Sequence, residues 1–330
     1  MPAAFGRASL AAATAFAAAL ALSGCGNSPT APTPPPAALV LTCPAPIDVE
    51  SPDDGPVDVH FALPLAQGGT PPVAITCSPQ SGSLFPVGVT TVNCTGTDSR
   101  PVTSTCSFTV TVRARPRLKA TSYLAFGDSI TYGVESAPIA KLSVGPPHSY
   151  PARLREMIVA RYKLQTFTVV NSGLPAELAS GTGKTRIVSE LNARRPEVVL
   201  LMEGSNDLGV HLEAGIRLAA DALEQMVRDS QNRGAIVFLA TIPPQRLGGK
   251  RDQVARLIPT FNDEVRAVAQ RTWAIPVDVY GAILPNIDLL IGVDDLHPTE
   301  KGFEVIADTF FQAIRANLES SGLPSPTRVR

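Results

Sequence analysis

From residue 121 onward, short apolar runs rich in β-branched side chains alternate with segments that have a helical period. Apolar side chains fall on one helix face in the segments 216–227 and 254–268. This alternation predicts a parallel sheet with helices on both faces, where ligands bind beyond the carboxyl ends of the strands. The predicted strands are Tyr123–Phe126, Phe167–Asn171, Val198–Met202, Ala235–Ala240 and Ile275–Val279.

Residues 39–113 show a different pattern, in which apolar and polar side chains alternate with a period of two. Gly and Pro turns separate these runs, so we predict a small all-β sandwich. Its cysteines are even in number and suit disulfides in an exported domain of this size. Of the three possible pairings we prefer Cys77–Cys94 across one hairpin and Cys43–Cys106 between the first and last strands. No two of them stand two to four residues apart, which disfavours a zinc site.

The first 38 residues predict export and attachment to a membrane. The apolar run Ala8–Leu22 follows Arg7 and is shorter than the ~20 residues that cross a bilayer, so 1–24 is interpreted as a signal peptide. The sequence LSGC, ending at Cys25, resembles a bacterial lipobox, which implies a lipid on Cys25; the alternative is an ordinary signal peptide. Because Gly26 stands where an Asp would retain some lipoproteins, we expect an extracytoplasmic lipoprotein of the outer membrane or cell surface.

Pro, Ser and Thr dominate residues 25–38, which predicts a stiff, extended tether. Residues 114–120 are a linker between the two folded regions 39–113 and 121–320, and 321–330 form a C-terminal tail. The basic side chains in and beside the linker either contact a phosphate surface or are solvated, and we favour solvation. They are Arg113, Arg115, Arg117 and Lys119.

The composition changes this picture little. The 330 residues are 44% hydrophobic and 17% charged, with a formal net charge of −1, so the chain can bury a core. No long Lys/Arg cluster indicates a nucleic-acid partner. The sequence contains no H-E-x-x-H or comparable spacing of metal ligands, so we predict no metal site. The run Gly181–Thr185 is not a P-loop because that motif's opening glycine falls on Leu178; we expect a flexible loop before a helix at 185–192.

Four polar motifs stand at strand ends or at a helix start, and their chemistry is complementary. A serine hydroxyl such as that of Ser129 needs an imidazole to remove its proton. Of the four histidines, His297 alone has a carboxylate three residues before it, so Asp294 is the predicted orienting acid; Asp295 is the alternative. The motifs are FGDSIT at 126–131, NSG at 171–173, GSND at 204–207 and DDLHP at 294–298.

An oxyanion needs hydrogen-bond donors, and three are available at these motifs. We expect the backbone N–H groups of Ser129 and Gly173 and the side-chain amide of Asn206 to supply them. The alternative for Asn206 is a helix cap. Asp128 is expected to hold its own loop, and Asp207 to be an acid at a helix start.

Together the four motifs resemble those of the SGNH, or GDSL, hydrolase family, whose named positions fall on Ser129, Gly173, Asn206 and His297. The resemblance implies a three-layer, flavodoxin-like α/β fold and ester hydrolysis without a cofactor. The second motif departs from the pattern, since NSGLPAE lacks a further glycine that many relatives carry, and the lipase elbow G-x-S-x-G is absent.

Residues 43–112 resemble a hyalin (HYR) repeat, on the segments ITCSPQSGSLFPVG, TTVNCTGTD and CSFTVTV. This implies an immunoglobulin-like sandwich for spacing or for contact with a cell surface or glycan.

We therefore expect a surface-anchored serine esterase that acts on short acyl or acetyl esters of carbohydrates. The alternatives are a lysophospholipase or thioesterase for longer chains and a non-catalytic adhesion lipoprotein. The chain-length preference depends on loops at 135–148 and 245–250, whose shapes the sequence does not predict.

Overall fold

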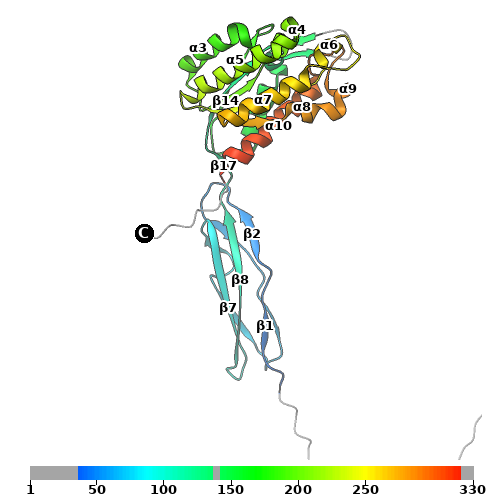
Figure 1. The fold of residues 1–330 in the computed structure, drawn as a ribbon. Helices are drawn as coiled ribbons and strands as arrows, with labels where there is room; N and C mark the ends of the chain where they lie inside the picture. Colours follow the sequence, from blue (N-terminus) through cyan, green and yellow to red (C-terminus); the bar gives the residue numbers. More distant parts are fainter. Residues whose placement is uncertain (1–35, 137–141, 321–330) are drawn as a thin grey trace, which may run out of the picture.

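The computed structural model describes residues 36–136 and 142–320, which form an elongated β-rich part and an α/β part joined end to end (Figure 1). The predicted signal peptide, Cys25, most of the tether and the tail 321–330 lie outside the described residues. Within the described ranges, no helix is both long and apolar enough to cross a membrane.

The β-rich part is built around a four-stranded sheet in the order β2-β8-β7-β5, with two further strand pairs, β1–β4 and β3–β6. Its core contains the side chains of Phe85, Val92 and Val110, which are fully buried. Two disulfides are present, Cys77–Cys94 between directly paired residues of β5 and β7, and Cys43–Cys106, the same pairing that the sequence favoured. The strands are β1 (Val40–Thr42), β2 (Ile47–Glu50), β3 (Val57–Val59), β4 (Leu65–Gln67), β5 (Ala74–Ser78), β6 (Ser83–Phe85), β7 (Gly88–Thr97) and β8 (Thr103–Arg113).

The linker is anchored on both sides, and its basic side chains are largely solvated, as expected: those of Arg113 and Arg117 are 55% and 47% exposed. Asp54 of the β-rich part accepts hydrogen bonds from the Arg115 N–H at 2.8 Å and from Arg117 Nη2 at 2.7 Å. Strand β9 (Arg117–Leu118) pairs with β17 (Glu319–Ser320) at the end of the chain's described part. These arginines also pair with acidic residues that lie far away in the sequence.

The α/β part contains a five-stranded, all-parallel sheet in the order β13-β10-β14-β15-β16. This is the flavodoxin-like order, in which the direction of winding changes between the first strand, β10, and the third, β14. Every residue of β14 is buried, as expected for a strand that is covered on both faces. The strands are β10 (Ser122–Gly127), β13 (Thr168–Gly173), β14 (Val198–Met202), β15 (Ile236–Ala240) and β16 (Ile275–Val277).

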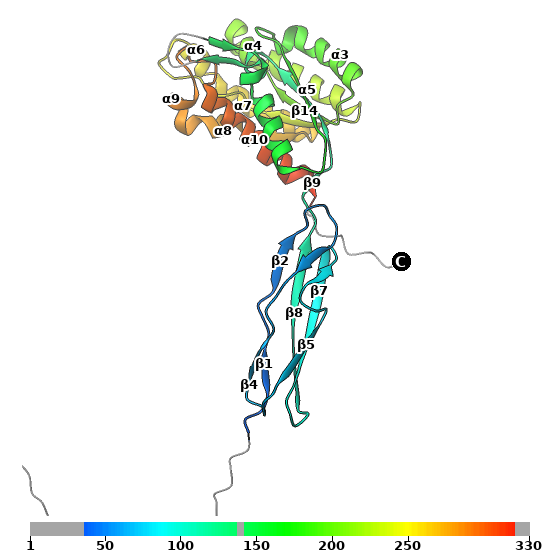
Figure 2. The same ribbon diagram turned by 180° about the vertical axis from the view of Figure 1, so that it is seen from behind.

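Helices cover both faces of this sheet, with α3, α5 and α7 on one side and α2 and α10 on the other (Figures 1 and 2). The segment 254–268, expected as one helix, is two, because the second begins with Pro259 in its first turn, where the missing N–H is tolerated. The helices are α1 (Ser129–Tyr132), α2 (Tyr150–Arg161), α3 (Lys184–Arg194), α4 (Ser205–His211), α5 (Glu213–Gln231), α6 (Asp252–Ala255), α7 (Ile258–Thr272), α8 (Val279–Ile283), α9 (Ile287–Leu290) and α10 (Glu300–Leu318).

Residues 179–183 do not form the flexible loop that the sequence suggested. They make a wide helical turn that runs directly into α3, which begins at Lys184. A short antiparallel pair, β11 (Val134–Ser136) and β12 (Leu142–Val144), follows α1. Short helical turns also occur at Pro146–His148 and Leu284–Asn286.

Candidate active site

Ser129 is the first residue of the short helix α1, directly beyond the carboxyl end of β10. Asp128 caps this helix, since its carboxylate accepts a hydrogen bond from the Ile130 N–H at 2.9 Å. At the first helical position the backbone N–H of Ser129 has no partner within the helix, which leaves it able to serve a ligand. Gly133 ends the helix at φ 107°, a conformation that favours glycine. The chain thus turns sharply on both sides of a serine that is 7% exposed.

His297 and Asp294 lie together in the loop before α10 and face Ser129. The Oγ of Ser129 is 2.9 Å from Nε2 of His297, and Nδ1 of His297 is 2.6 Å from Oδ2 of Asp294. The other carboxylate oxygen, Oδ1 of Asp294, accepts the backbone N–H groups of His297 at 3.0 Å and Leu296 at 3.1 Å. The three side chains form a continuous chain of hydrogen bonds with the geometry of a Ser-His-Asp triad.

Asp294 is held in its ionised form. Its partial burial raises the pKa, but the hydrogen bonds from the side chain and backbone of His297 and from Leu296 outweigh burial and keep the pKa well below its usual range. An ionised carboxylate fixes the proton of His297 on Nδ1 and leaves Nε2 free to accept one.

The remaining histidines lie elsewhere. His60 stands beside Asp58 in the β-rich part, and His148 lies 3.4 Å from Glu135. Asp295, the alternative orienting acid, turns away from His297 and pairs instead with Arg246 at 2.7 Å.

Gly173 is the last residue of β13, and Asn206 lies in the first turn of α4, which follows β14; these two strands flank β10. The Nδ2 of Asn206 donates to the carbonyl of Glu177 at 2.9 Å, and an amide carries a second N–H for another acceptor. The N–H of Gly173 donates to Oδ1 of Asn171 at 2.9 Å, so service as an oxyanion donor requires this bond to be shared or released. Glycine is needed at 173 for a second reason, because a Cβ there would lie 2.0 Å from the backbone nitrogen of Tyr132. A side chain would push the nucleophile's helix away from the sheet.

A buried ion pair that the sequence did not reveal supports these strand ends. Arg186 of α3 donates from Nε to both carboxylate oxygens of Glu177 at 2.9 Å, and its guanidinium lies 3.9 Å over the ring of Phe126. From Nη1 it also donates to the carbonyl of Ser172 at 3.0 Å, next to Gly173. Arg186 therefore links the residue that orients Asn206 to strands β10 and β13.

Asp207 lies in the first turn of α4, as expected for an acid at a helix start, and it also anchors the neighbouring helical turn 179–183. Its fully buried carboxylate accepts the N–H groups of Ala179 at 2.8 Å and Ser180 at 3.0 Å. The signal for such a role is weak in the sequence, because Asp at the first turn of a helix is common for electrostatic reasons alone.

Two further buried acids lie beneath the site. Burial raises the pKa of Asp128 to about 6, although the Ile130 N–H and nearby His297 oppose the rise. Glu203, directly after β14, is 1% exposed, and neither carboxylate oxygen has a hydrogen-bond partner among the described residues. Burial first, and then the nearby Asp128 and Glu177, raise the pKa of Glu203 well above its usual range, which favours its neutral form. An acidic residue that directly follows five apolar strand residues was the available signal for it.

A cavity of about 590 Å³ lies beside this rim rather than at the triad. Gln245, Arg246, Leu247 and Tyr280 are among its lining residues, and Ser129 and His297 are not. Within residues 36–136 and 142–320, no group of three His, Cys, Asp or Glu side chains is arranged to hold a metal ion.

Comparison with known proteins identifies the families that the two parts of the chain match and solved structures with a similar fold. Residues 125–305 match the model of the GDSL-like lipase/acylhydrolase family, and residues 33–112 match the HYR domain. An acetylxylan esterase from Geobacillus stearothermophilus is similar in structure, with a TM-score of 0.50 and 22% identity over 63% of this chain and 99% of that one. A lipase/acylhydrolase from Enterococcus faecalis is also similar, with a TM-score of 0.51 and 22% identity over 60% and 97% of the two chains. No curated protein sequence matches the chain.

Proposed function

The chain belongs to the GDSL-like lipase/acylhydrolase family and is a carboxylic ester hydrolase, and from this premise we propose that it cleaves short acyl esters through an acyl-enzyme on Ser129. We propose acetyl groups on carbohydrates as substrates. The observation that carries the proposal is the unbroken set of hydrogen bonds from Ser129 Oγ through His297 to Asp294. The fold shared with an acetylxylan esterase supports the choice of substrate.

In the proposed reaction, Nε2 of His297 takes the proton of Ser129 as the Oγ attacks the acyl carbon. The carbonyl oxygen becomes an oxyanion, which the Ser129 N–H, the second N–H of Asn206 and the released N–H of Gly173 stabilise. The ester C–O bond then breaks, and the alcohol leaves with the proton from His297. Water attacks the acyl carbon and gives a proton to His297. The bond between that carbon and Oγ of Ser129 then breaks, His297 returns the proton to Oγ, and the carboxylic acid departs.

Hydrolysis of p-nitrophenyl esters from acetate to palmitate by the purified protein tests this proposal, with Ser129→Ala as the control. We expect hydrolysis that falls with acyl length and is lost in the variant. A maximum at long chains would favour a lysophospholipase or thioesterase. Equal, slow hydrolysis by both proteins would leave the non-catalytic adhesion lipoprotein as the better account.

We further propose that the protein is exported and held at a membrane by a lipid on Cys25. The LSGC sequence and the two disulfides in the β-rich part support this, because disulfides persist in oxidising compartments. In this arrangement the Pro-rich tether and the β-rich part carry the esterase away from the membrane. Cells fed a labelled fatty acid should label the wild-type protein and not Cys25→Ala; label retained in the variant would refute the attachment site.

A further inference from the structure

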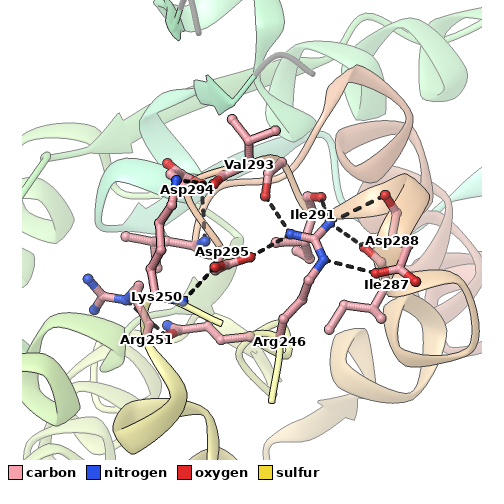
Figure 3. A network of polar contacts seen from close by, with 12 residues as sticks. Arg246, Lys250, Arg251, Ile287, Asp288, Ile291, Val293, Asp294 and Asp295 are labelled. Atoms are coloured by element: carbon pink, nitrogen blue, oxygen red, sulfur yellow. Dashed lines mark hydrogen bonds and ion pairs between the residues drawn. The ribbon is translucent and has the colours of Figure 1, made fainter. Parts of the chain in front are cut away.

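Arg246, in the loop after β15, lies at the centre of a polar network around the loop that carries Asp294 and His297 (Figure 3). Its Nη1 donates to Oδ1 of Asp295 at 2.7 Å and to the carbonyl of Gly292 at 2.7 Å. Its Nη2 donates to the carbonyl of Ile291 and, at 3.3 Å, to that of Ile287 at the start of α9. One side chain thus joins the start of α9 to the loop that follows it.

Asp295 is the side chain through which this network binds the loop 292–297. It is 7% exposed, and its second carboxylate oxygen accepts the backbone N–H of Lys250 at 2.8 Å. Burial raises the pKa of Asp295, but the Lys250 N–H and Arg246 outweigh it and hold the pKa below its usual range. The side chain of Lys250 adds a bond to the carbonyl of Val293 at 2.7 Å. Arg246 and Lys250, both in the loop after β15, therefore bind the tip of the loop 292–297.

The backbone conformation of the loop 292–297 explains how the contacts of Asp295 affect the position of the neighbouring Asp294. The base of the loop is closed, because the Gly292 N–H donates to the carbonyl of His297 at 2.9 Å. At its tip Asp295 adopts φ 62°, a left-handed conformation that is uncommon outside glycine and that Asp and Asn tolerate better than other residues. The two consecutive carboxylates point in different directions. That of Asp295 faces Arg246 (Figure 3), and that of Asp294 binds His297.

We propose that Arg246 and Asp295 are positioning residues, whose ion pair holds the loop 292–297 in the conformation that aligns Asp294 with His297. The inference rests on the proposed function, in which Asp294 and His297 act on Ser129. It assigns separate tasks to the two adjacent acids: Asp294 orients the base, and Asp295 orients Asp294 through the backbone.

Asp295→Asn tests the proposal, and Asp288→Asn is its matched control. Asp288 also pairs with Arg246, at 3.0 Å, but its side chain is 91% exposed and belongs to α9 rather than to the catalytic loop. Both variants remove one carboxylate charge from the same arginine. A displacement of about 1 Å at a catalytic group costs up to roughly 100-fold in rate. We expect Asp295→Asn to lower kcat by about 10- to 100-fold with KM changed less than about twofold, and Asp288→Asn to stay within about twofold of wild type.

Two further variants separate positioning from folding. Arg246→Met should lower kcat at least as much as Asp295→Asn, because it also removes the bonds to the carbonyls of Gly292 and Ile291. The double variant should lose little more than Arg246→Met alone, because the contact with Asp295 is already absent there. Arg246→Lys keeps one charge for Asp295 and should recover part of the loss. Equal losses in Asp288→Asn and Asp295→Asn, additive losses in the double variant, or an Asp295→Asn loss confined to KM would each overturn the proposal.

A spectroscopic measurement keeps the proposal testable independently of the esterase reaction. The proton between Nδ1 of His297 and Asp294 gives a far-downfield proton NMR signal when this hydrogen bond is short and protected. We expect the signal in wild type and Asp288→Asn and its loss or broadening in Asp295→Asn. If wild type hydrolyses no ester but shows this pattern, the proposed function fails and the positioning role holds. An unchanged signal in folded Asp295→Asn refutes the positioning role.

Discussion

Replacing Arg186 with Met should destabilise the α/β part far more than replacing a surface arginine. Arg186 pairs with Glu177, whose side chain is fully buried, and its guanidinium also binds the carbonyl of Ser172. Without the arginine, the Glu177 carboxylate keeps only the Thr182 hydroxyl, at 2.9 Å, of the side-chain partners described here. Removing one member of a buried ion pair costs about 3–5 kcal/mol, because the other charge remains buried.

Urea unfolding measures this loss. In thermal unfolding the same loss, at about 2–4 °C per kcal/mol for a part of this size, should lower the melting temperature by roughly 6–20 °C. Arg217→Met is the control, since the Arg217–Asp221 pair is exposed and such pairs contribute about 0–1 kcal/mol. The double variant Glu177→Gln/Arg186→Met should regain part of the stability. Equal effects of Arg186→Met and Arg217→Met would refute this reasoning.

Three other outcomes are expected. Asn206→Ala should lower kcat by about 10²- to 10³-fold with little change in KM, as steady-state kinetics will show, because one oxyanion donor is lost. Since the pKa of Asp128 is raised to about 6, the free energy of unfolding falls as the pH rises from about 4 to 6. Asp128→Asn should remove about 3 kcal/mol of this pH-dependent fall, measured by urea unfolding, and an unchanged pH dependence in the variant would contradict the prediction. Cys43→Ser/Cys106→Ser should cost the β-rich part about 3–4 kcal/mol in thermal unfolding and leave kcat unchanged, because the triad lies in the other part.

Local patterns predicted most of the fold. The strands beginning near residues 123, 198 and 275 were visible as apolar runs because strands of a parallel sheet are buried on both faces. The break between α6 and α7 was not predicted, since the apolar spacing continues across Arg256 and Leu257 and only Pro259 signals a new helix.

The candidate site was predictable where its residues are close in sequence or follow strands. Asp294 and His297 share one loop, so their spacing alone suggested the contact that the structure shows. The support around them was not predictable, because Arg246 meets Asp295 across 49 positions and Arg186 meets Gly127 across 59. Such pairings depend on how strands and loops are arranged in space. The residues next to an arginine in the sequence do not indicate whether its side chain pairs with a distant acid or lies in solvent.

The central claim, that Ser129 forms the acyl-enzyme, is tested most directly by trapping. The protein is incubated with a phosphonate ester that reacts irreversibly with activated serines, digested, and mapped by mass spectrometry. The geometry of Ser129 and His297 predicts one added phosphonyl group on the peptide that contains Ser129, none in Ser129→Ala, and strongly reduced labelling in His297→Ala. Labelling of another serine, with ester hydrolysis retained in Ser129→Ala, would contradict the claim.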